Sequence, residues 1–347
     1  MKNYFQLFAV LLFSITILYV TGCKKDSNTE NEVGIEEPNL PSEMMTLSAI
    51  AYAGDSSSNK IITDSIIYYL KKESLTTKGK WKLAWGPGIS SGNANLVYVV
   101  KNTTNEITSY AIAIRGTNVH SIGDILQDVI IKPTAFTYGM PGDSVSLGSM
   151  IGFTNIITSK DTLGLTTLEQ YLESITSSTK IPLYITGHSQ GGGLAPLVAY
   201  WLMNHEHFKD KFTFSTYAFA GPGWFNKNFR DNFLSTLPPD ASFHMMVNSL
   251  DMIPYGYANL PGLIDKSIPV TVPSLYRGLI TLAEGLLKID KAVYYDIAVA
   301  DTIGNFPITT NPAGTTIQDS INWYDHWLLV EHNHNNYLRL LGAVPLN

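Results

Sequence analysis

Ser189 stands in a sequence pattern that would make it a nucleophile. It is the third residue of Gly187-His-Ser-Gln-Gly191, which follows an apolar run at 181–185 and precedes a helical pattern at 194–202. Between a strand and a helix, a G-x-S-x-G turn strains the serine backbone and exposes its hydroxyl. The two glycines leave room where strand and helix pass closely. The helix start would stabilise an oxyanion, so the N–H of Gln190 is one expected donor, unless the pattern is only a Gly/Ser-rich turn.

A serine hydroxyl needs a general base, usually a histidine, and an acid that orients this histidine. In folds with such a turn, the chain order is serine, acid, histidine. The best acid is Asp251, which follows an expected strand at 243–247 and precedes Pro254. An Asx-turn role is the alternative for Asp251. The base must come later in the chain, which leaves three candidates: His326, His332 and His334.

A second oxyanion donor should come from the loop after an early strand. Ile112-Ala-Ile-Arg-Gly-Thr117 ends such a strand, so the backbone N–H of Thr117 is the candidate, with an ordinary strand-end turn as the alternative. Glu331, His332 and His334 could instead form a metal site. Residues two apart share a side only on a strand, and the sequence shows no other ligand cluster, so neither a metal nor a cofactor is expected.

Alternating strands and helices predict an α/β fold with a largely parallel sheet, whose strands carry catalytic groups at their carboxyl ends. Ser189 and Asp251 both follow expected strands. The terminal helix is either continuous or broken near His332. Helices are expected at 43–53, 61–70, 121–131, 150–157, 166–175, 194–202, 226–234, 275–289 and 321–341, and strands at 81–85, 96–101, 107–114, 181–185, 212–220, 243–247 and 292–300.

The first residues of the chain have the pattern of a targeting segment. Lys2 precedes an apolar run at 5–20, and Val20-Thr-Gly-Cys23 closes it with small residues. This pattern resembles a bacterial lipobox, so we expect a signal peptide at 1–22 and a lipid on Cys23. The run is short for a spanning helix, and a plain secretory signal is the other alternative. Polar, acidic residues 23–41 predict a flexible tether to a folded domain at 42–347.

Composition limits the classes of partner. The chain has 347 residues, a net charge of −6 and a single cysteine. Its basic residues are not clustered, which argues against nucleic acid as a partner. A lone cysteine excludes a disulfide within the chain. With the lipobox, the expected location is the bacterial cell envelope, where the lipid anchors the protein to a membrane, either the outer membrane or the cell surface.

Five segments, taken in order, resemble the class 3 (fungal-type) lipase family of α/β-hydrolases. The Gly187–Gly191 turn is the nucleophile elbow of that family. The other four are Ile114-Arg-Gly-Thr117, similar to F-R-G-[ST] of the oxyanion hole; Ser121-Ile-Gly-Asp-Ile-Leu-Gln-Asp128, similar to the lid helix; Asp251-Met-Ile-Pro254, similar to the acid motif D-x-V-P; and His334-Asn-Asn-Tyr337, similar to the base motif H-x-x-Y.

The resemblance implies an α/β-hydrolase whose mostly parallel central sheet is flanked by helices. It implies Ser189, Asp251 and His334 as the catalytic residues, with Thr117 and Gln190 in the oxyanion hole. The implied activity is that of a serine esterase that cleaves acylglycerols or related lipid esters through an acyl-enzyme. The alternatives are an esterase on polysaccharide-linked acyl groups and an inactive, membrane-tethered binding protein. Residues 119–127 are expected to form a lid, with a helix that packs permanently on the core as the alternative. The stretch at 255–322 is longer than usual for the family.

Overall fold

The computed structural model describes residues 40–54, 58–104, 106–116, 131–264, 272–304 and 316–347. Several expectations lie outside these residues: the signal peptide, Cys23, the tether up to residue 39, Thr117 and the lid at 119–127. The expected tether end at residue 41 is wrong, because a helix begins at Leu40. Residues Pro38–Asn347 form one compact unit. None of the described helices has the length and apolar character needed to cross a bilayer.

Within the described residues, seven strands form one sheet in the order β1-β2-β3-β6-β7-β8-β9. The pairs β1–β2 and β2–β3 are antiparallel, whereas β3, β6, β7, β8 and β9 pair in parallel. The expected α/β fold with a mostly parallel sheet is therefore confirmed. The strands are β1 (Lys82–Ile89), β2 (Leu96–Thr104), β3 (Ile107–Ile114), β6 (Ile181–His188), β7 (Phe212–Phe219), β8 (Ser242–Asn248) and β9 (Asp301–Ile303). A separate pair, β4 (Pro133–Ala135) and β5 (Ser144–Ser146), occupies a stretch without an expected strand.

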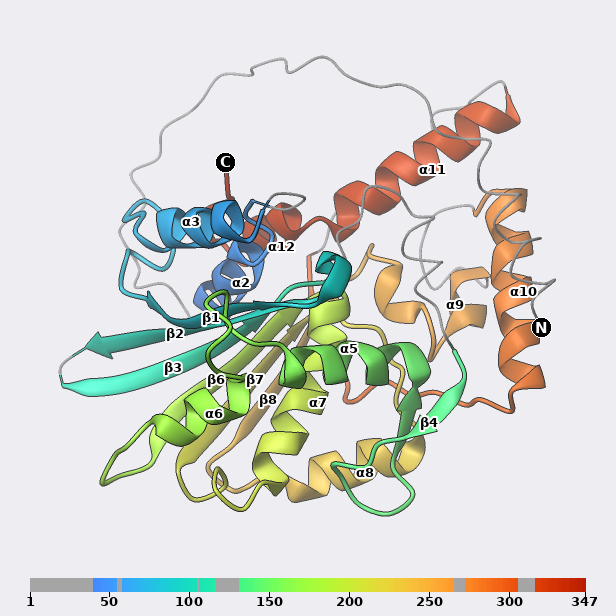
Figure 1. The fold of residues 1–347 in the computed structure, drawn as a ribbon. Coiled ribbons are helices and arrows are strands. Elements are labelled where there is room, and N and C mark those ends of the chain that lie inside the picture. The colour runs from blue at the N-terminus through green and yellow to red at the C-terminus, as the bar shows by residue number, and fades with distance from the viewer. Residues whose placement is uncertain (1–39, 55–57, 105, 117–130, 265–271, 305–315) are drawn as a thin grey trace. The chain divides into compact units, whose positions relative to one another are not determined.

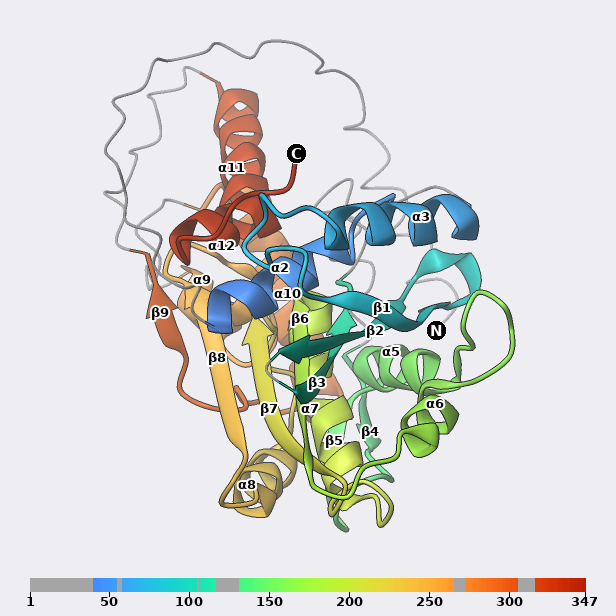
Figure 2. The ribbon, with the colours of Figure 1, turned by 90° about the vertical axis from the view of Figure 1, so that its left-hand side faces the viewer.

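Helices cover both faces of the sheet (Figures 1 and 2). One face carries α2 (Leu40–Ile50), α3 (Asn59–Leu70) and α12 (His334–Leu340), and the other carries α5 (Leu147–Thr158), α6 (Leu168–Ser174), α7 (Gln190–Asn204) and α8 (Lys227–Thr236). The period-two pattern of β2 accounts for the two layers. Tyr98 is buried in the cluster under α2 and α3, whereas Val97 and Val99 are buried in the cluster that contains α7.

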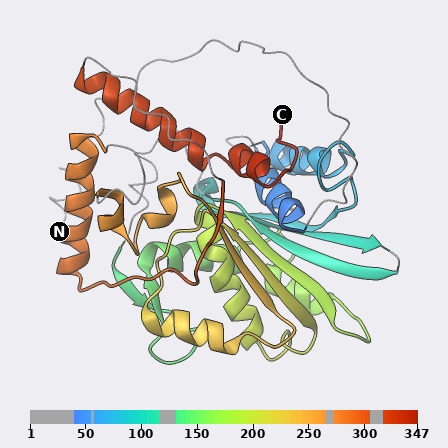
Figure 3. The same ribbon diagram turned by 180° about the vertical axis from the view of Figure 1, so that it is seen from behind.

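Three further helices lie together after the end of β8 (Figures 1 and 3). They are α9 (Leu260–Ile264), α10 (Ser274–Ile289) and α11 (Ile317–His332), and a short 3₁₀ turn, η2 (Ile253–Tyr255), precedes them. A third core cluster joins this group, with Met252, Ile280, Tyr324 and Trp327 among its buried members. The core of α10 and α11 is thus continuous with the segment that carries Asp251.

The terminal helix is broken, which decides between the two expected forms. α11 ends at His332 and α12 begins at His334. Asn333 between them has extended backbone (φ −63°, ψ 134°), and its side chain accepts a hydrogen bond from the N–H of Asn335 at 2.8 Å. Asparagine is favoured as an N-cap because its side chain satisfies an unpaired helical N–H.

The expected strand at 292–300 is wrong, because these residues have no regular strand and β9 follows at Asp301–Ile303. Ala292, Tyr294 and Ile297 are buried in the core without joining the sheet. The apolar run reflects packing of irregular chain, which apolar character alone cannot distinguish from a strand.

Both edges of the main sheet are short or irregular. β1 has shifts in its pairing with β2 on either side of Trp85, and it contains Pro87, which has no N–H to donate. β9, at the other edge, has three residues.

Candidate active site

The turn between β6 and α7 has the strained geometry of a nucleophile elbow. Ser189 has φ 61° and ψ −129°, a conformation that non-glycine residues rarely adopt, and its N–H donates to the carbonyl of Phe219 at 2.9 Å. A Cβ on Gly187 would lie 2.2 Å from the carbonyl oxygen of Gly191. A Cβ on Gly191 would lie 2.3 Å from the carbonyl oxygen of Ile114. Only glycine allows these close approaches, as the sequence indicated.

Two hydrogen bonds join Ser189, His332 and Asp251. The Oγ of Ser189 lies 2.7 Å from Nε2 of His332, and Nδ1 of His332 lies 2.7 Å from Oδ2 of Asp251. All three side chains are buried. An ionised carboxylate only accepts hydrogen bonds, so Nδ1–H of His332 donates to Asp251. Nε2 then accepts from the serine hydroxyl, which is the arrangement needed to remove its proton.

His334 does not join this arrangement, which corrects the expectation that it supplies the base. Its ring stacks on Tyr52, with 4.8 Å between ring centroids and 13° between planes. Burial lowers the pKa of His334 to about 4, with a smaller effect from nearby His332. The helix break at Asn333 explains why the two histidines have different contacts. His332 is the last residue of α11 and His334 is the first residue of α12, so they do not belong to one continuous helix. The third candidate, His326, is exposed on α11.

Asp251 is held by two further donors. Its Oδ2 also accepts a hydrogen bond from the hydroxyl of Tyr337 at 2.7 Å, and its Oδ1 accepts from the N–H of Ile253 at 2.9 Å. The bond from Ile253 is an Asx-turn contact, so Asp251 has the alternative role as well as the contact with His332. The N–H of Asn248 donates to the Tyr337 hydroxyl at 3.0 Å. Tyr337 therefore links the end of β8 to the acid.

The Tyr337→Phe variant should lower kcat on a soluble ester by about tenfold to a hundredfold with little change in KM. A hydrogen bond to a charged group contributes about 1.5–3 kcal/mol, and its loss would free the Asp251 carboxylate to move. The control is Tyr68→Phe, whose ring is 58% exposed. A KM effect alone, without loss of kcat, would contradict this positioning role.

Asn248 ties the acid segment to the residue before His332. Its Nδ2 donates to the carbonyl of Glu331 at 3.0 Å and to the Glu331 carboxylate at 2.8 Å. Its Oδ1 accepts from the N–H of Leu250 at 3.1 Å. The Glu331 carboxylate also accepts a hydrogen bond from Nδ2 of Asn336 at 3.1 Å. Asn248 is fully buried, so these contacts fix the spacing of the acid and histidine segments.

Tyr52, two residues after α2, contacts two chain segments that lie beside Ser189. Its hydroxyl accepts from the N–H of Gly116 at 3.1 Å and lies 3.0 Å from Nδ1 of His188. A Cβ on Gly116 would lie 2.7 Å from Cβ of Ser189, so the chain leading to Thr117 passes directly beside the nucleophile. Gln190 begins α7, and its side chain accepts from Asn95 at 3.0 Å. Thr117 itself is outside the described residues, so its expected oxyanion role is untested.

Burial keeps two histidines beside the site neutral. The pKa of His188 falls well below its usual value, first because of burial and then because of His332, and the pKa of His334 falls to about 4. A lowered pKa makes both rings weaker bases, and the imidazole that contacts the Ser189 hydroxyl is that of His332. The structure also does not support a metal at Glu331, His332 and His334, since no group of metal-holding side chains occurs in the described part of the chain.

The low pKa of His334 makes stability depend on pH. The folded-state pKa lies below the unfolded value of about 6.5, so the unfolded chain binds the proton first as pH falls. The contribution of His334 is complete above pH 6.5 and is lost between about 6.5 and 4, at up to about 1.4 kcal/mol per pH unit. Urea unfolding across this window should show a smaller slope for His334→Phe, which keeps a ring beside Tyr52. An unchanged slope would contradict the assignment.

Comparison with known proteins extends these findings. The family model described as Lipase (class 3) matches residues 111–259, which include β3, the elbow and Asp251. Over these residues the chain matches the class 3 lipase family. With the contacts of Ser189, His332 and Asp251, this match makes the chain a serine carboxylic ester hydrolase of the α/β-hydrolase fold. All three candidate histidines, His326, His332 and His334, lie beyond the matched residues, so the family match does not choose between them.

A solved lipase structure with a high structural similarity shares the fold. M37 lipase is 25% identical, with a TM-score of 0.72, and the match covers 88% of this chain and 94% of that chain. Lipase II from Rhizopus niveus is 19% identical, with a TM-score of 0.46 and coverage of 62% and 72%. A triacylglycerol lipase from Penicillium expansum is 14% identical, with a TM-score of 0.45 and coverage of 63% and 73%. No curated protein matches the chain in sequence.

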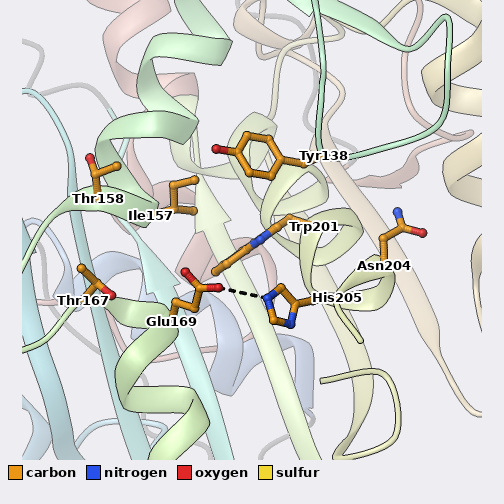
Figure 4. Close-up of a pocket in the computed structure, with 8 residues that line it drawn as sticks. All are labelled: Tyr138, Ile157, Thr158, Thr167, Glu169, Trp201, Asn204 and His205. Carbon is orange, nitrogen blue, oxygen red and sulfur yellow. Dashed lines mark hydrogen bonds and ion pairs between the residues drawn. The ribbon is translucent and has the colours of Figure 1, made fainter. Parts of the chain in front are cut away.

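A cavity of about 500 Å³ lies at the far end of α7 (Figure 4). Glu169 and His205 meet there, with 3.0 Å between Oε1 and Nε2, beside Trp201 and Asn204. At a rise of about 1.5 Å per residue, the length of α7 puts this cavity about 20 Å from Ser189. It is therefore separate from the nucleophile.

Proposed function

We propose that this protein is a lipase that cleaves acylglycerols or related lipid esters through an acyl-enzyme on Ser189. The observation that carries the proposal is the pair of 2.7 Å contacts from Ser189 to His332 and from His332 to Asp251. The family match supports ester hydrolysis. The hydrogen bonds from Tyr337 and Ile253 to the buried Asp251 support a triad whose side chains are already in position.

In the proposed reaction, Oγ of Ser189 attacks the ester carbonyl while Nε2 of His332 takes the hydroxyl proton. Asp251 stabilises the resulting imidazolium through Nδ1–H. The tetrahedral oxyanion is stabilised by backbone N–H groups at the start of α7, including that of Gln190, and by that of Thr117. His332 then protonates the leaving alcohol, and the acyl group remains on Ser189. Water attacks this acyl-enzyme, with His332 again as base, and releases the carboxylic acid.

A fluorophosphonate probe tests the nucleophile directly. We expect covalent labelling of the parent protein and none of Ser189→Ala. A chain-length series of soluble and emulsified esters tests the substrate class, and we expect higher kcat/KM for medium or long acyl chains than for acetyl or feruloyl esters. Preference for acetyl or feruloyl esters would favour the polysaccharide-ester alternative. A parent protein that is folded but unlabelled would favour the inactive binding protein.

We also propose that a lipid on Cys23 anchors the protein in the bacterial cell envelope, at the outer membrane or cell surface. The support is the pattern of Lys2, the apolar run at 5–20 and the small residues before the single cysteine. Cys23→Ser should abolish metabolic labelling of the protein with a radioactive fatty acid and leave the precursor uncleaved. Retained labelling would overturn this proposal.

A further inference from the structure

α10 has two apolar sides, and the core uses one of them. Its inner side, which includes Tyr276, Ile280, Ala283 and Leu287, packs against the third core cluster. A second set of apolar residues is offset by about one position along the helix and continues just past its end. We call it the outer stripe, and its members are Leu282, Leu286, Ile289 and Val293, with exposed fractions of 46%, 42%, 76% and 64%.

The spacing of the outer stripe is that of one helical side. Positions 282, 286 and 289 are four and three residues apart, so their side chains lie above one another. Two exposed lysines, Lys288 and Lys291, stand with the exposed Asp290 at the carboxyl end of the stripe, which leaves one net positive charge there. The remaining side of α10 is polar and includes Thr281. A helix with an exposed apolar side and flanking lysines has the pattern of a helix that lies in a lipid–water interface, with the lysine stems along apolar surface and the ammonium groups in water.

α10 is linked through α11 to both segments that hold the triad. The Tyr276 hydroxyl donates to the carboxylate of Asp325 on α11, and the rings of Tyr276 and Tyr324 lie 4.7 Å apart. Tyr324 contacts Met252, the residue after Asp251, with 2.6 Å between Oη and Sδ. α11 ends at His332. Figure 1 shows α9 beside α10, and one end of α10 close to α11. Anything that binds to α10 is therefore placed at a defined position relative to Asp251 and His332.

We propose that the outer stripe of α10 docks this enzyme onto the surface of a lipid assembly that contains its ester substrate. The proposal rests on the proposed lipase function. The extent of the stripe distinguishes this occupant from a second copy of the chain. A stable protein interface buries about 800 Å² per partner with some 20–30 residues, far more than four side chains on one helix. An interfacial helix needs one apolar side at the depth of the headgroups, and the lysines complement anionic headgroups.

The test compares Leu282→Gln/Leu286→Gln/Ile289→Gln with the control Leu163→Gln/Leu165→Gln. The control leucines are 78% and 69% exposed on the loop between α5 and α6. Both variants and their parent consist of residues 38–347, the compact unit that contains all three core clusters. The probe is vesicles of phosphatidylcholine mixed with phosphatidylglycerol, and binding is measured by co-sedimentation. Turnover of a water-soluble short-chain ester is measured in parallel.

We expect the triple variant to bind vesicles at least about thirtyfold more weakly than the parent, while the control variant binds like the parent. Turnover of the soluble ester should be unchanged in both. Equal vesicle binding by parent and triple variant would overturn the docking proposal, as would a parent that does not bind. A parent that forms dimers, and a triple variant that does not, would assign the stripe to a second copy and also overturn it. If the parent binds vesicles through the stripe but cleaves no ester, the proposed function fails while docking stands.

Discussion

Replacing His332 with alanine should lower kcat on a soluble ester by about 10⁴- to 10⁶-fold. The imidazole is the only group of the described residues at hydrogen-bond distance from both Ser189 and Asp251, at 2.7 Å in each case. Without it, the serine hydroxyl has no proton acceptor at neutral pH. The measurement is steady-state hydrolysis of a short-chain ester, with circular dichroism to verify folding.

The matched control is His334→Ala, two residues further along the chain. It should lower kcat by no more than about tenfold, because His334 contacts Tyr52 and neither Ser189 nor Asp251. This variant should be less thermally stable than the parent, because removing the stacked imidazole ring leaves a gap beside Tyr52. If the effects of the two substitutions on kcat were exchanged, the assignment of the base would be wrong.

The substitutions Ser189→Ala and Ser189→Gly should both abolish turnover, with kcat reduced by about 10⁴- to 10⁶-fold. They should differ in stability. The backbone at φ 61° and ψ −129° is unfavourable for any residue with a Cβ, and strain of this kind costs about 1–3 kcal/mol. Glycine removes the strain but gives the unfolded chain more freedom, at a cost of about 0.5–1 kcal/mol. We therefore expect Ser189→Gly to be more stable than Ser189→Ala by about 1 kcal/mol in urea unfolding.

Equal stability of the two Ser189 variants would mean that the elbow is not strained in the folded protein. Measurable turnover by either variant would mean that Ser189 is not the nucleophile. The pair thus separates the chemical role of the hydroxyl from the conformational cost of holding it in place.

The parts of the site that the sequence predicted are those encoded locally. The elbow was predictable because the glycines at 187 and 191 and the flanking apolar patterns lie within about 20 residues of one another. Asp251 was predictable for the same reason, from the strand before it and Pro254 after it. The parallel sheet followed from the alternation of strand and helix patterns, and β3 was predicted with its observed bounds, Ile107–Ile114.

The choice between His332 and His334 depended on where one helix ended. A continuous helix and a helix broken at Asn333 place these side chains very differently, and the H-x-x-Y pattern favoured His334. The Asn cap that causes the break was visible in the sequence, since Asn333 lies between the two histidines. Giving the cap more weight than the motif would have pointed to His332.

The supporting residues could not be found from local patterns. Tyr52, Asn248 and Tyr337 act across 64 to 86 positions of sequence, through hydrogen bonds to Gly116, Glu331 and Asp251. Tyr337 was noted only as part of a motif, and its contact with the acid depends on how α12 packs on the sheet. Such contacts follow from tertiary structure and leave no periodic signal in the chain.

The irregular edges of the main sheet have a consequence for proteins held close together. A long, regular edge strand exposes unpaired N–H and C=O groups that can pair with an edge of another molecule and start aggregation. β1 interrupts its outer row with Pro87 and shifted pairing, and β9 offers three residues. If a lipid confines many copies to one membrane, collisions between them become frequent. Edges of this kind would then let the protein accumulate at high density without edge-to-edge association.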